Sequence, residues 1–150
     1  MASQKQTIKS YRDLEVFQNS YKASITVLTQ ILPKLPKEEQ YDLTDQLRRS
    51  VKAIPRLIAE GYGKKHQRKG FERYLTDAMA EANETVVGLS HCRDVYFRHV
   101  DPKLCEELID IYDKTGRQLY KLAEAWRKFT KEEELTDKRK PKDKKRYGQP

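Results

Sequence analysis

Apolar side chains recur at steps of three and four residues along four long segments of this chain, and this spacing limits the possible folds more than any other feature of the sequence. In an α-helix the spacing gathers apolar side chains on one face, whereas a half-buried strand requires strict alternation. No long segment of the sequence shows that alternation. The sequence therefore predicts four amphipathic helices and no sheet.

The first two predicted helices are separated by prolines. The first ends at Pro33 and Pro36, because a proline inside a helix removes a backbone donor. The second begins near Pro36 and ends at Gly61 or Gly63, where glycine caps a helix at little cost. Pro55 is expected to bend this second helix. The residues expected to face the core are Leu14, Phe17, Tyr21, Ile25, Leu28 and Leu32 in the first helix and Leu43, Leu47, Val51, Ile54 and Ile58 in the second.

The third and fourth predicted helices are separated by Asp101 and Pro102. An aspartate at the N-cap followed by a proline at the first helical position is typical of a helix start. The fourth helix is therefore expected to begin here. The residues expected to face the core are Phe71, Leu75, Ala78, Ala82, Val86, Leu89 and Tyr96 in the third helix and Leu104, Leu108, Ile111, Thr115, Leu119, Leu122 and Trp126 in the fourth.

Helices of about 20 to 28 residues are about 30 to 40 Å long and, when joined by short connections, pack side by side. The predicted fold class is therefore all-α, an antiparallel up-down-up-down four-helix bundle over residues 11–129. Residues 1–10 are expected to be a flexible N-terminus. From about Thr130 the apolar period fails and charged residues dominate, so residues 130–150 are expected to be a disordered basic tail.

Three features of the sequence bear on the cellular compartment. No apolar run approaches the roughly 18 to 20 residues that span a bilayer. Residues 1–10 lack the apolar segment of a secretory signal. Cys92 and Cys105 lie in predicted helices and are expected to be reduced thiols. We therefore expect a cytoplasmic protein without a membrane partner.

Positive charge is concentrated in the second predicted helix and the loop after it. Residues 48–73 contain nine lysines and arginines against two acidic residues, an excess of +7 in a chain whose net charge is +8. Three of these residues recur at steps of four opposite the expected core face, and no acid interrupts the loop. Both an ordinary solvated face and a phosphate-binding surface fit this pattern. The candidate nucleic-acid-binding residues are Arg48, Arg49, Lys52, Arg56, Lys64, Lys65, Arg68, Lys69 and Arg73.

Other side chains are candidates for contacts between subunits. The third helix has an acidic flank, and the fourth has a second, partly apolar stripe away from its expected core face, which a monomeric bundle does not need. Both ordinary exposed faces and a contact that closes a ring of subunits fit these features. The candidate interface residues are Asp77, Glu81, Glu84, Ile109, Tyr112, Gly116 and Tyr120. Ala123 extends the stripe, and the first helix has a weaker version in Val16, Ser20, Ala23 and Val27.

Residue patterns that carry catalysis or bind cofactors are sparse. The three histidines and two cysteines lack a zinc-finger spacing. Gly61 and Gly63 end a predicted helix instead of following a strand, and they lack the spacing of a phosphate-binding loop. Glu60 and Glu84 lack the ExxH partners that di-iron bundles require. We therefore expect no enzyme, no metal site and no cofactor.

The second and third predicted helices contain several ordered motifs: Gln46-Leu47-Arg48-Arg49, Ile54-Pro55, Ile58-Ala59-Glu60-Gly61 and Glu81-Ala82-Asn83-Glu84-Thr85. With these motifs, the chain resembles, over about residues 11–127, the bacterial four-helix-bundle protein family found in open reading frames within intervening sequences of large-subunit rRNA genes. More distantly, it is similar to the accessory variability determinant proteins of diversity-generating retroelements. Leu57 stands where many members have asparagine, so a role of that asparagine is not carried over.

The resemblance implies an up-down bundle that assembles as a homopentamer, binds nucleic acid and, in the retroelement relatives, partners a reverse transcriptase. Together with the basic surface, it predicts a non-enzymatic accessory protein that binds nucleic acid as a ring-shaped homo-oligomer and assists a reverse transcriptase or an RNA-processing complex. The alternative is a protein-interaction scaffold that docks an acidic or RNA-bound partner enzyme without itself binding nucleic acid. The sequence leaves open whether the ligand is RNA or DNA.

Overall fold

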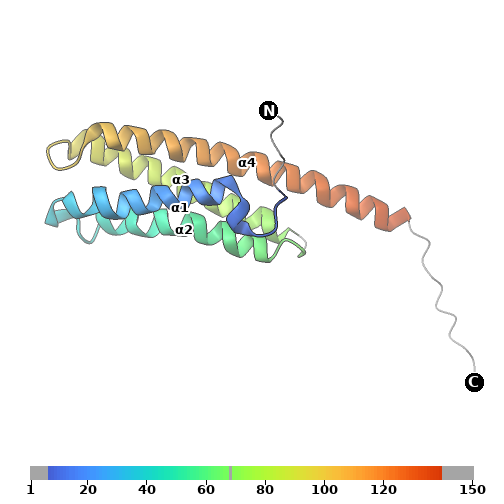
Figure 1. Ribbon diagram of the computed structural model, residues 1–150. Coiled ribbons are helices and arrows are strands. Elements are labelled where there is room, and N and C mark those ends of the chain that lie inside the picture. Colours follow the sequence, from blue (N-terminus) through green and yellow to red (C-terminus); the bar gives the residue numbers. More distant parts are fainter. Residues whose placement is uncertain (1–6, 68, 140–150) are drawn as a thin grey trace, which may run out of the picture.

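The computed structural model describes residues 7–67 and 69–139 of the 150-residue chain. Four long helices pack side by side, and each runs antiparallel to the next one in the chain (Figure 1). These ranges contain no strand, and the predicted four-helix bundle is confirmed. None of the helices in the same ranges is both long and apolar enough to cross a membrane. The helices are α1 (Glu15–Thr26), α2 (Leu43–Gly63), α3 (Gly70–Val95) and α4 (Pro102–Arg139).

Short helical segments flank α1. Ser10 caps the turn before α1 by accepting a hydrogen bond from the Arg12 amide. The predicted break at Pro33 and Pro36 falls among the short segments that lie between α1 and α2. The short segments are the 3-10 turns η1 (Tyr11–Asp13), η3 (Leu32–Lys34) and η4 (Lys37–Glu39) and the π-helical η2 (Val27–Ile31).

α2 buries the face that its apolar period predicts, and it continues through Pro55 without interruption. It lies close to α3, because a Cβ added at Gly88 would be only 2.6 Å from Cδ2 of Leu47. A Cβ added at Gly61 would be equally close to Cβ of Tyr74. Glycine at these two positions therefore permits the close approach of the two helices. The buried stripe of α2 consists of Leu43, Leu47, Val51, Ile54 and Ile58.

The first helix buries only part of the face that its large apolar residues predict. Leu32 is buried, and Leu14, Phe17 and Leu28 pack partly buried against the core, as expected. Tyr21 is 52% exposed and Ile25 is 45% exposed, although the sequence places both in the core. Smaller side chains, which the sequence assigns to a weak second stripe, are buried instead. The buried hydroxyls of Ser20 and Ser24 donate to carbonyls of the preceding turn, so their burial leaves no donor unpaired. The buried residues include Val16, Ser20, Ala23 and Val27.

α4 buries a wider face than the sequence predicts. Ile109 and Tyr112 were expected at an outward interface, yet they are 7% and 1% exposed. Ala123 of the same stripe is buried, whereas Ile111, expected in the core, is 38% exposed. The reason is that α4 packs extensively against α3 and also against α1, so a broad sector of its surface contacts other helices. Ile109 and Tyr112 therefore belong to the core of this chain.

α4 continues through Arg139, beyond the other three helices (Figure 1). The apolar period does end near Thr130, but lysine and glutamate favour the helical state without any packing. The helix therefore extends past the boundary that loss of the apolar period predicts. Residues 1–6 and 140–150, which hold most of the expected flexible N-terminus and part of the expected tail, lie outside the described residues.

Candidate nucleic-acid interface

Three exposed cations, Arg48, Lys52 and Arg56, lie on the face of α2 opposite its buried stripe, and we call them the basic ridge. They follow one another along the helix because residues four apart lie on the same side. Arg49 is exposed beside them and forms an ion pair with Asp45 at 2.9 Å. An exposed pair of this kind contributes little to stability, but it offsets the charge of Arg49. The ridge therefore consists of three cations and excludes Arg49.

The turn between α2 and α3, residues 64–69, continues the positive surface, and we call it the basic turn. Nζ of Lys64 donates to Oη of Tyr74 at 2.7 Å, and this hydrogen bond raises the pKa of Lys64. Nζ of Lys65 lies 3.9 Å from the centre of the Tyr62 ring, a cation–π distance. Aromatic side chains therefore position both ammonium groups without removing their charge.

Two residues shape the backbone where the basic turn meets α3. Lys69 has a φ of 59°, in the left-handed region that favours glycine. A Cβ added at Gly70 would lie 2.6 Å from the carbonyl oxygen of Lys64, so glycine is needed where α3 begins. Lys69 and Arg73 are exposed at this end of α3, whereas the candidate Arg68 lies outside the described residues.

The acidic flank of α3 lies beside the basic ridge. Glu81 is close enough to Arg56 of α2, and to Asp77 and Glu84 of α3, to interact electrostatically with all three. Partial burial, and then repulsion by Glu84, raises the pKa of Glu81. Two sets of residues to which the sequence assigns separate roles are therefore neighbours in one subunit. Part of the positive charge of the ridge is offset at Arg56.

Three of the other candidate interface residues, Tyr112, Gly116 and Tyr120, border a groove of about 380 Å³ between α3 and α4. Tyr120 is 61% exposed at its edge, and Gly116 is half-buried. Met79 and Asn83 of α3 form the facing wall. Tyr112 also borders the groove, but burial raises the pKa of its hydroxyl, which stays protonated. Of the expected stripe on α4, Tyr120 is the member most available to a second molecule.

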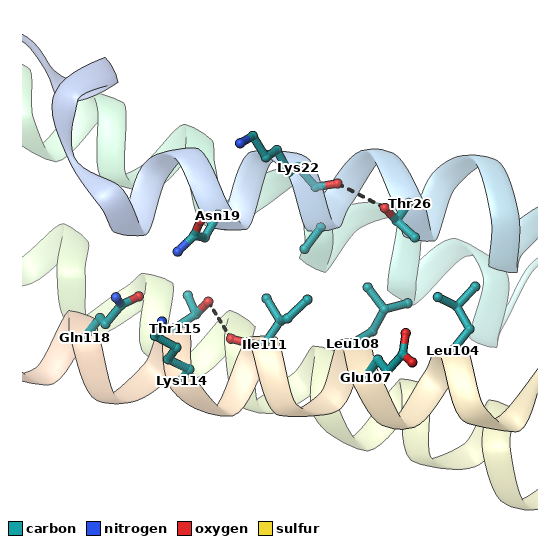
Figure 2. Close-up of a pocket in the computed structure, with 11 residues that line it drawn as sticks. Asn19, Lys22, Thr26, Leu104, Glu107, Leu108, Ile111, Lys114, Thr115 and Gln118 are labelled. Atoms are coloured by element: carbon teal, nitrogen blue, oxygen red, sulfur yellow. Dashed lines mark hydrogen bonds between the residues drawn. The ribbon is translucent and has the colours of Figure 1, made fainter.

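A largely apolar groove between α1 and α4 is a feature that sequence reasoning missed. Figure 2 shows Asn19 of α1 and Gln118 of α4 on its opposite walls. Leu104 and Leu108 line it, and its volume is about 430 Å³. α1 packs less extensively against α4 than α3 does, which leaves this seam open. The groove was not predicted because it depends on which face of α1 is turned inward.

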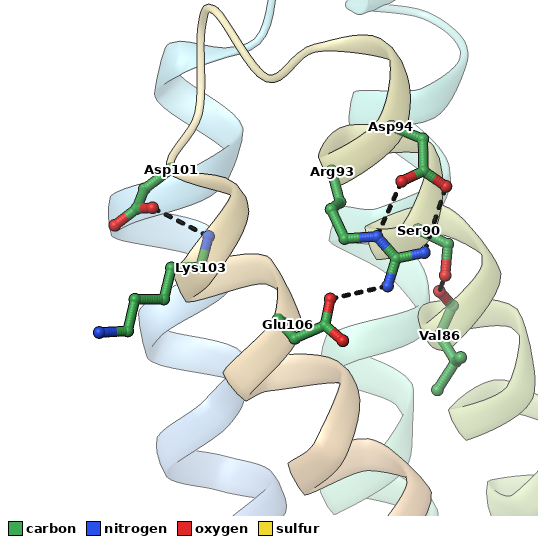
Figure 3. Close-up of polar contacts among 7 residues, drawn as sticks. All are labelled: Val86, Ser90, Arg93, Asp94, Asp101, Lys103 and Glu106. Carbon is green, nitrogen blue, oxygen red and sulfur yellow. Dashed lines mark hydrogen bonds and ion pairs between the residues drawn. The ribbon is translucent and has the colours of Figure 1, made fainter.

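The opposite end of the bundle, around the turn from α3 to α4, carries paired charges (Figure 3). Nε of Arg93 donates to Oδ1 of Asp94 at 2.8 Å, and Nη1 donates to Oε2 of Glu106 at 2.9 Å. The hydrogen bond from Arg93 lowers the pKa of Asp94. Asp101 accepts from the Lys103 amide at 2.9 Å, which confirms the predicted cap of α4. Arg93 is therefore neutralised by its neighbours.

The two cysteines lie in the interior of the bundle. Cys92 and Cys105 are buried and unbonded to each other. Burial raises the pKa of Cys92 to about 12 and also raises that of Cys105, so both thiols stay protonated and unreactive. Within residues 7–67 and 69–139, no group of three or more His, Cys, Asp or Glu side chains is placed to hold a metal ion. The described surface therefore provides charged side chains and apolar area.

The sequence profile of one protein family, described as 23S rRNA-intervening sequence protein, matches residues 12–121. The matched segment contains α1, α2, α3 and the first part of α4, and with them the basic ridge and the basic turn. A comparison with curated proteins gives no match. The family agrees with the one that the motifs of the second and third helices indicate, and the match covers most of the chain. The chain therefore belongs to the 23S rRNA-intervening sequence protein family.

Proposed function

We propose that this chain is a non-enzymatic accessory protein that binds nucleic acid in the cytoplasm as a ring-shaped homo-oligomer. The observation that carries the proposal is the exposed basic ridge of Arg48, Lys52 and Arg56, together with the basic turn at the end of the same helix. Such a surface attracts a polyanion. The family name, which refers to 23S rRNA, favours RNA as that polyanion.

The proposed binding depends on phosphates and not on bases. Lysines and arginines along one helix face neutralise backbone phosphates and release counterions, so that affinity falls as salt is added. Phosphate contacts position a protein on nucleic acid but carry no sequence information. The proposed ligand is therefore any RNA or DNA strand that fits the surface, irrespective of its sequence.

The proposal includes assembly into a ring, with five subunits as the resemblance implies. Tyr21 and Ile25 are exposed on α1 and Tyr120 is exposed on α4, so apolar side chains lie on two different helices. Contact between two different faces of identical subunits is heterologous, and such a contact forms a ring when the rotation between subunits closes. The acidic flank is a candidate partner for cations of a neighbouring subunit. Five copies of the positive surface on one ring increase both avidity and salt dependence.

A second candidate function is a protein-interaction scaffold that docks an acidic or RNA-bound enzyme, such as a reverse transcriptase, without itself binding nucleic acid. The exposed apolar face of α1 favours it, because Tyr21 and Ile25 suit a protein contact better than a phosphate contact. In that case the basic ridge would recognise carboxylates of the partner enzyme.

Fluorescence anisotropy with a single-stranded RNA, a duplex RNA and a duplex DNA, each at two salt concentrations, tests the proposal. We expect binding to all three, with log affinity falling by about 0.7 to 0.9 per phosphate contacted for each unit of log salt. No binding to any of the three at low salt would reject the proposal and leave the scaffold function in its place.

Light scattering tests the ring separately. We expect an oligomer at micromolar concentration, with a mass that is a multiple of the 17.7 kDa chain. A monomer at that concentration would reject the ring and the increase in avidity that depends on it. Phosphate binding by a single subunit would still be tested by the anisotropy measurement.

A further inference from the structure

A hollow of about 650 Å³ lies between the basic turn and the part of α4 that extends beyond the bundle. Lys65 and Lys69 border it from the turn, and Trp126, Phe129 and Lys131 border it from α4. We call it the aromatic hollow. Its two aromatic residues follow residue 121, where the family match ends, so the family assignment says nothing about them.

Three aromatic rings lead from the core of the bundle to this hollow. Phe71 is buried, and the Trp126 ring packs edge-on against it with the ring centres 5.1 Å apart. The Phe129 ring lies 5.4 Å from Trp126 and is 49% exposed. Phe129 is therefore an exposed ring that contacts Trp126, which in turn packs against the buried Phe71. A supported ring next to solvent provides a stacking surface with little side-chain freedom left to lose.

Three lysines border the hollow together with the exposed ring. Lys65 is held over the Tyr62 ring, and within the described residues Lys69 and Lys131 form no ion pair. Four carboxylates also border the hollow. Nε of Arg127 donates to Glu72 at 2.7 Å and so neutralises it, whereas Glu133, Glu134 and Asp137 lie farther along α4, after Phe129. Glu134 and Asp137 also have partners of their own. The lysines are thus the groups placed to meet an anion beside the ring.

We infer that the aromatic hollow binds single-stranded nucleic acid, with a base stacked on Phe129 and the adjoining phosphates on Lys65, Lys69 and Lys131. The inference rests on the proposed nucleic-acid-binding function and adds the form of ligand that this site selects. An unpaired base has a free face to stack on an aromatic ring, whereas the bases of a duplex are already stacked on one another. The basic ridge has no aromatic partner of this kind and does not make this distinction.

Substitution of Phe129 tests the stacking contact. Phe129→Ala should weaken binding of a single-stranded oligouridylate or oligothymidylate about 5- to 150-fold, the range expected when one base loses an aromatic platform. Affinity for a duplex RNA should stay unchanged, and Phe129→Tyr should restore single-strand affinity. The matched control is Leu135→Ala, because Leu135 is 55% exposed on the same extension and does not border the hollow.

Anisotropy measurements on these variants give a clear outcome either way. A loss of affinity that is confined to single strands supports the inference. No loss on single strands, or an equal loss on single strands and duplex, overturns it while the proposed phosphate-binding function stands. If the wild-type protein binds neither ligand, the inference and the proposed function fall together. Circular dichroism should show unchanged helicity in all variants, since both substituted side chains are half-exposed or more.

Trp126 provides a direct readout because it is the only tryptophan in the chain. A base that enters the hollow should quench its fluorescence, with the same midpoint as the anisotropy titration of the single strand. Inorganic polyphosphate, a polyanion without bases, should bind without quenching. A single strand that binds by anisotropy but leaves Trp126 emission unchanged would place the ligand elsewhere and overturn the inference.

Discussion

Cationic side chains have different kinds of partner at the two ends of the bundle. At the turn from α3 to α4, Arg93 is held by the carboxylates of Asp94 and Glu106. At the turn from α2 to α3, Lys64 and Lys65 are held by the tyrosine rings of Tyr74 and Tyr62. A carboxylate neutralises the cation that it positions, whereas a tyrosine side chain leaves the positive charge of the cation unchanged. The positive charge is therefore offset at the first end, whereas Lys64 and Lys65 keep theirs at the second.

Both ends rest on one core, and a core substitution should affect the whole fold. Leu47→Ala should lower the free energy of unfolding by about 2 to 5 kcal/mol, because Leu47 is 1% exposed and packs against Gly88 of α3. Urea denaturation provides the measurement. Leu119, which is fully buried in α4, should behave in the same way. If both variants lower the free energy of unfolding by less than about 0.5 kcal/mol, the effect is that of a surface substitution. Neither position would then belong to the core.

Stability at the end of the bundle that contains the turn from α3 to α4 should depend on pH. The end that contains the basic turn should not show this dependence. Oη of Tyr96 donates to Glu39, whose other oxygen accepts from the Leu43 amide at the start of α2. The hydrogen bond from Tyr96 lowers the pKa of Glu39 below its ordinary value of 4.5. A carboxyl with a lowered folded-state pKa contributes stability that is fully present above the unfolded-state pKa and is lost as pH falls through the folded-state value.

Tyr96→Phe should therefore lower the free energy of unfolding at pH 7, and only slightly, because solvent close to the hydrogen bond weakens it. The difference from the wild type should shrink below pH 4.5 as Glu39 becomes protonated. Thermal unfolding at several pH values provides the measurement. Tyr41→Phe is the control, since Tyr41 is 88% exposed. A difference that is the same at every pH would contradict the role of Glu39.

Substitutions of exposed side chains on the sides of the bundle should affect assembly more than folding. Tyr120→Ala and Tyr21→Ala should each change the free energy of unfolding of the subunit by less than about 0.5 kcal/mol, because both side chains are more than half exposed. Both should weaken association in sedimentation or light-scattering experiments, whereas Tyr41→Ala should not. If Tyr120→Ala unfolds the subunit and leaves association unchanged, the proposed place of Tyr120 at the interface is wrong.

The contrast between α2 and α1 explains how far the fold could be predicted from the sequence. α2 has a single apolar stripe opposite a row of cations, so its orientation follows from the pattern alone. α1 has a face of large apolar residues such as Tyr21 and a face of small ones such as Ala23. Both suit burial, and in the structure Ala23 is buried whereas Tyr21 is 52% exposed. A helical period locates an apolar face but does not choose between two of them.

The candidate site was predictable to a similar extent. The exposure of Arg48, Lys52 and Arg56 followed from the orientation of α2. The proximity of Arg56 to Glu81 and of Phe129 to the basic turn depends on how separate helices meet. Phe129 lies 60 residues after Lys69, the last residue of the turn, at the edge of the segment that the lost apolar period assigns to a tail. No local pattern in the sequence brings these residues together.

The central claim is that the surface formed by the basic ridge and the basic turn binds phosphate, and one paired measurement tests it most directly. Arg48, Lys52 and Arg56 are replaced together by glutamine, and the control replaces Lys34, Lys37 and Lys103, three exposed lysines near the other end, in the same way. Both variants lose three charges, so any difference between them reports on position and not on net charge.

Anisotropy at two salt concentrations should show the ridge variant binding every RNA and DNA ligand more weakly, with the slope of log affinity against log salt reduced by about 2 to 3. The control variant should keep most of the wild-type affinity and slope. Equal losses in the two variants would contradict the account, because general attraction by net charge would then explain the binding. Unchanged affinity and slope in the ridge variant would also contradict it and would favour the scaffold function.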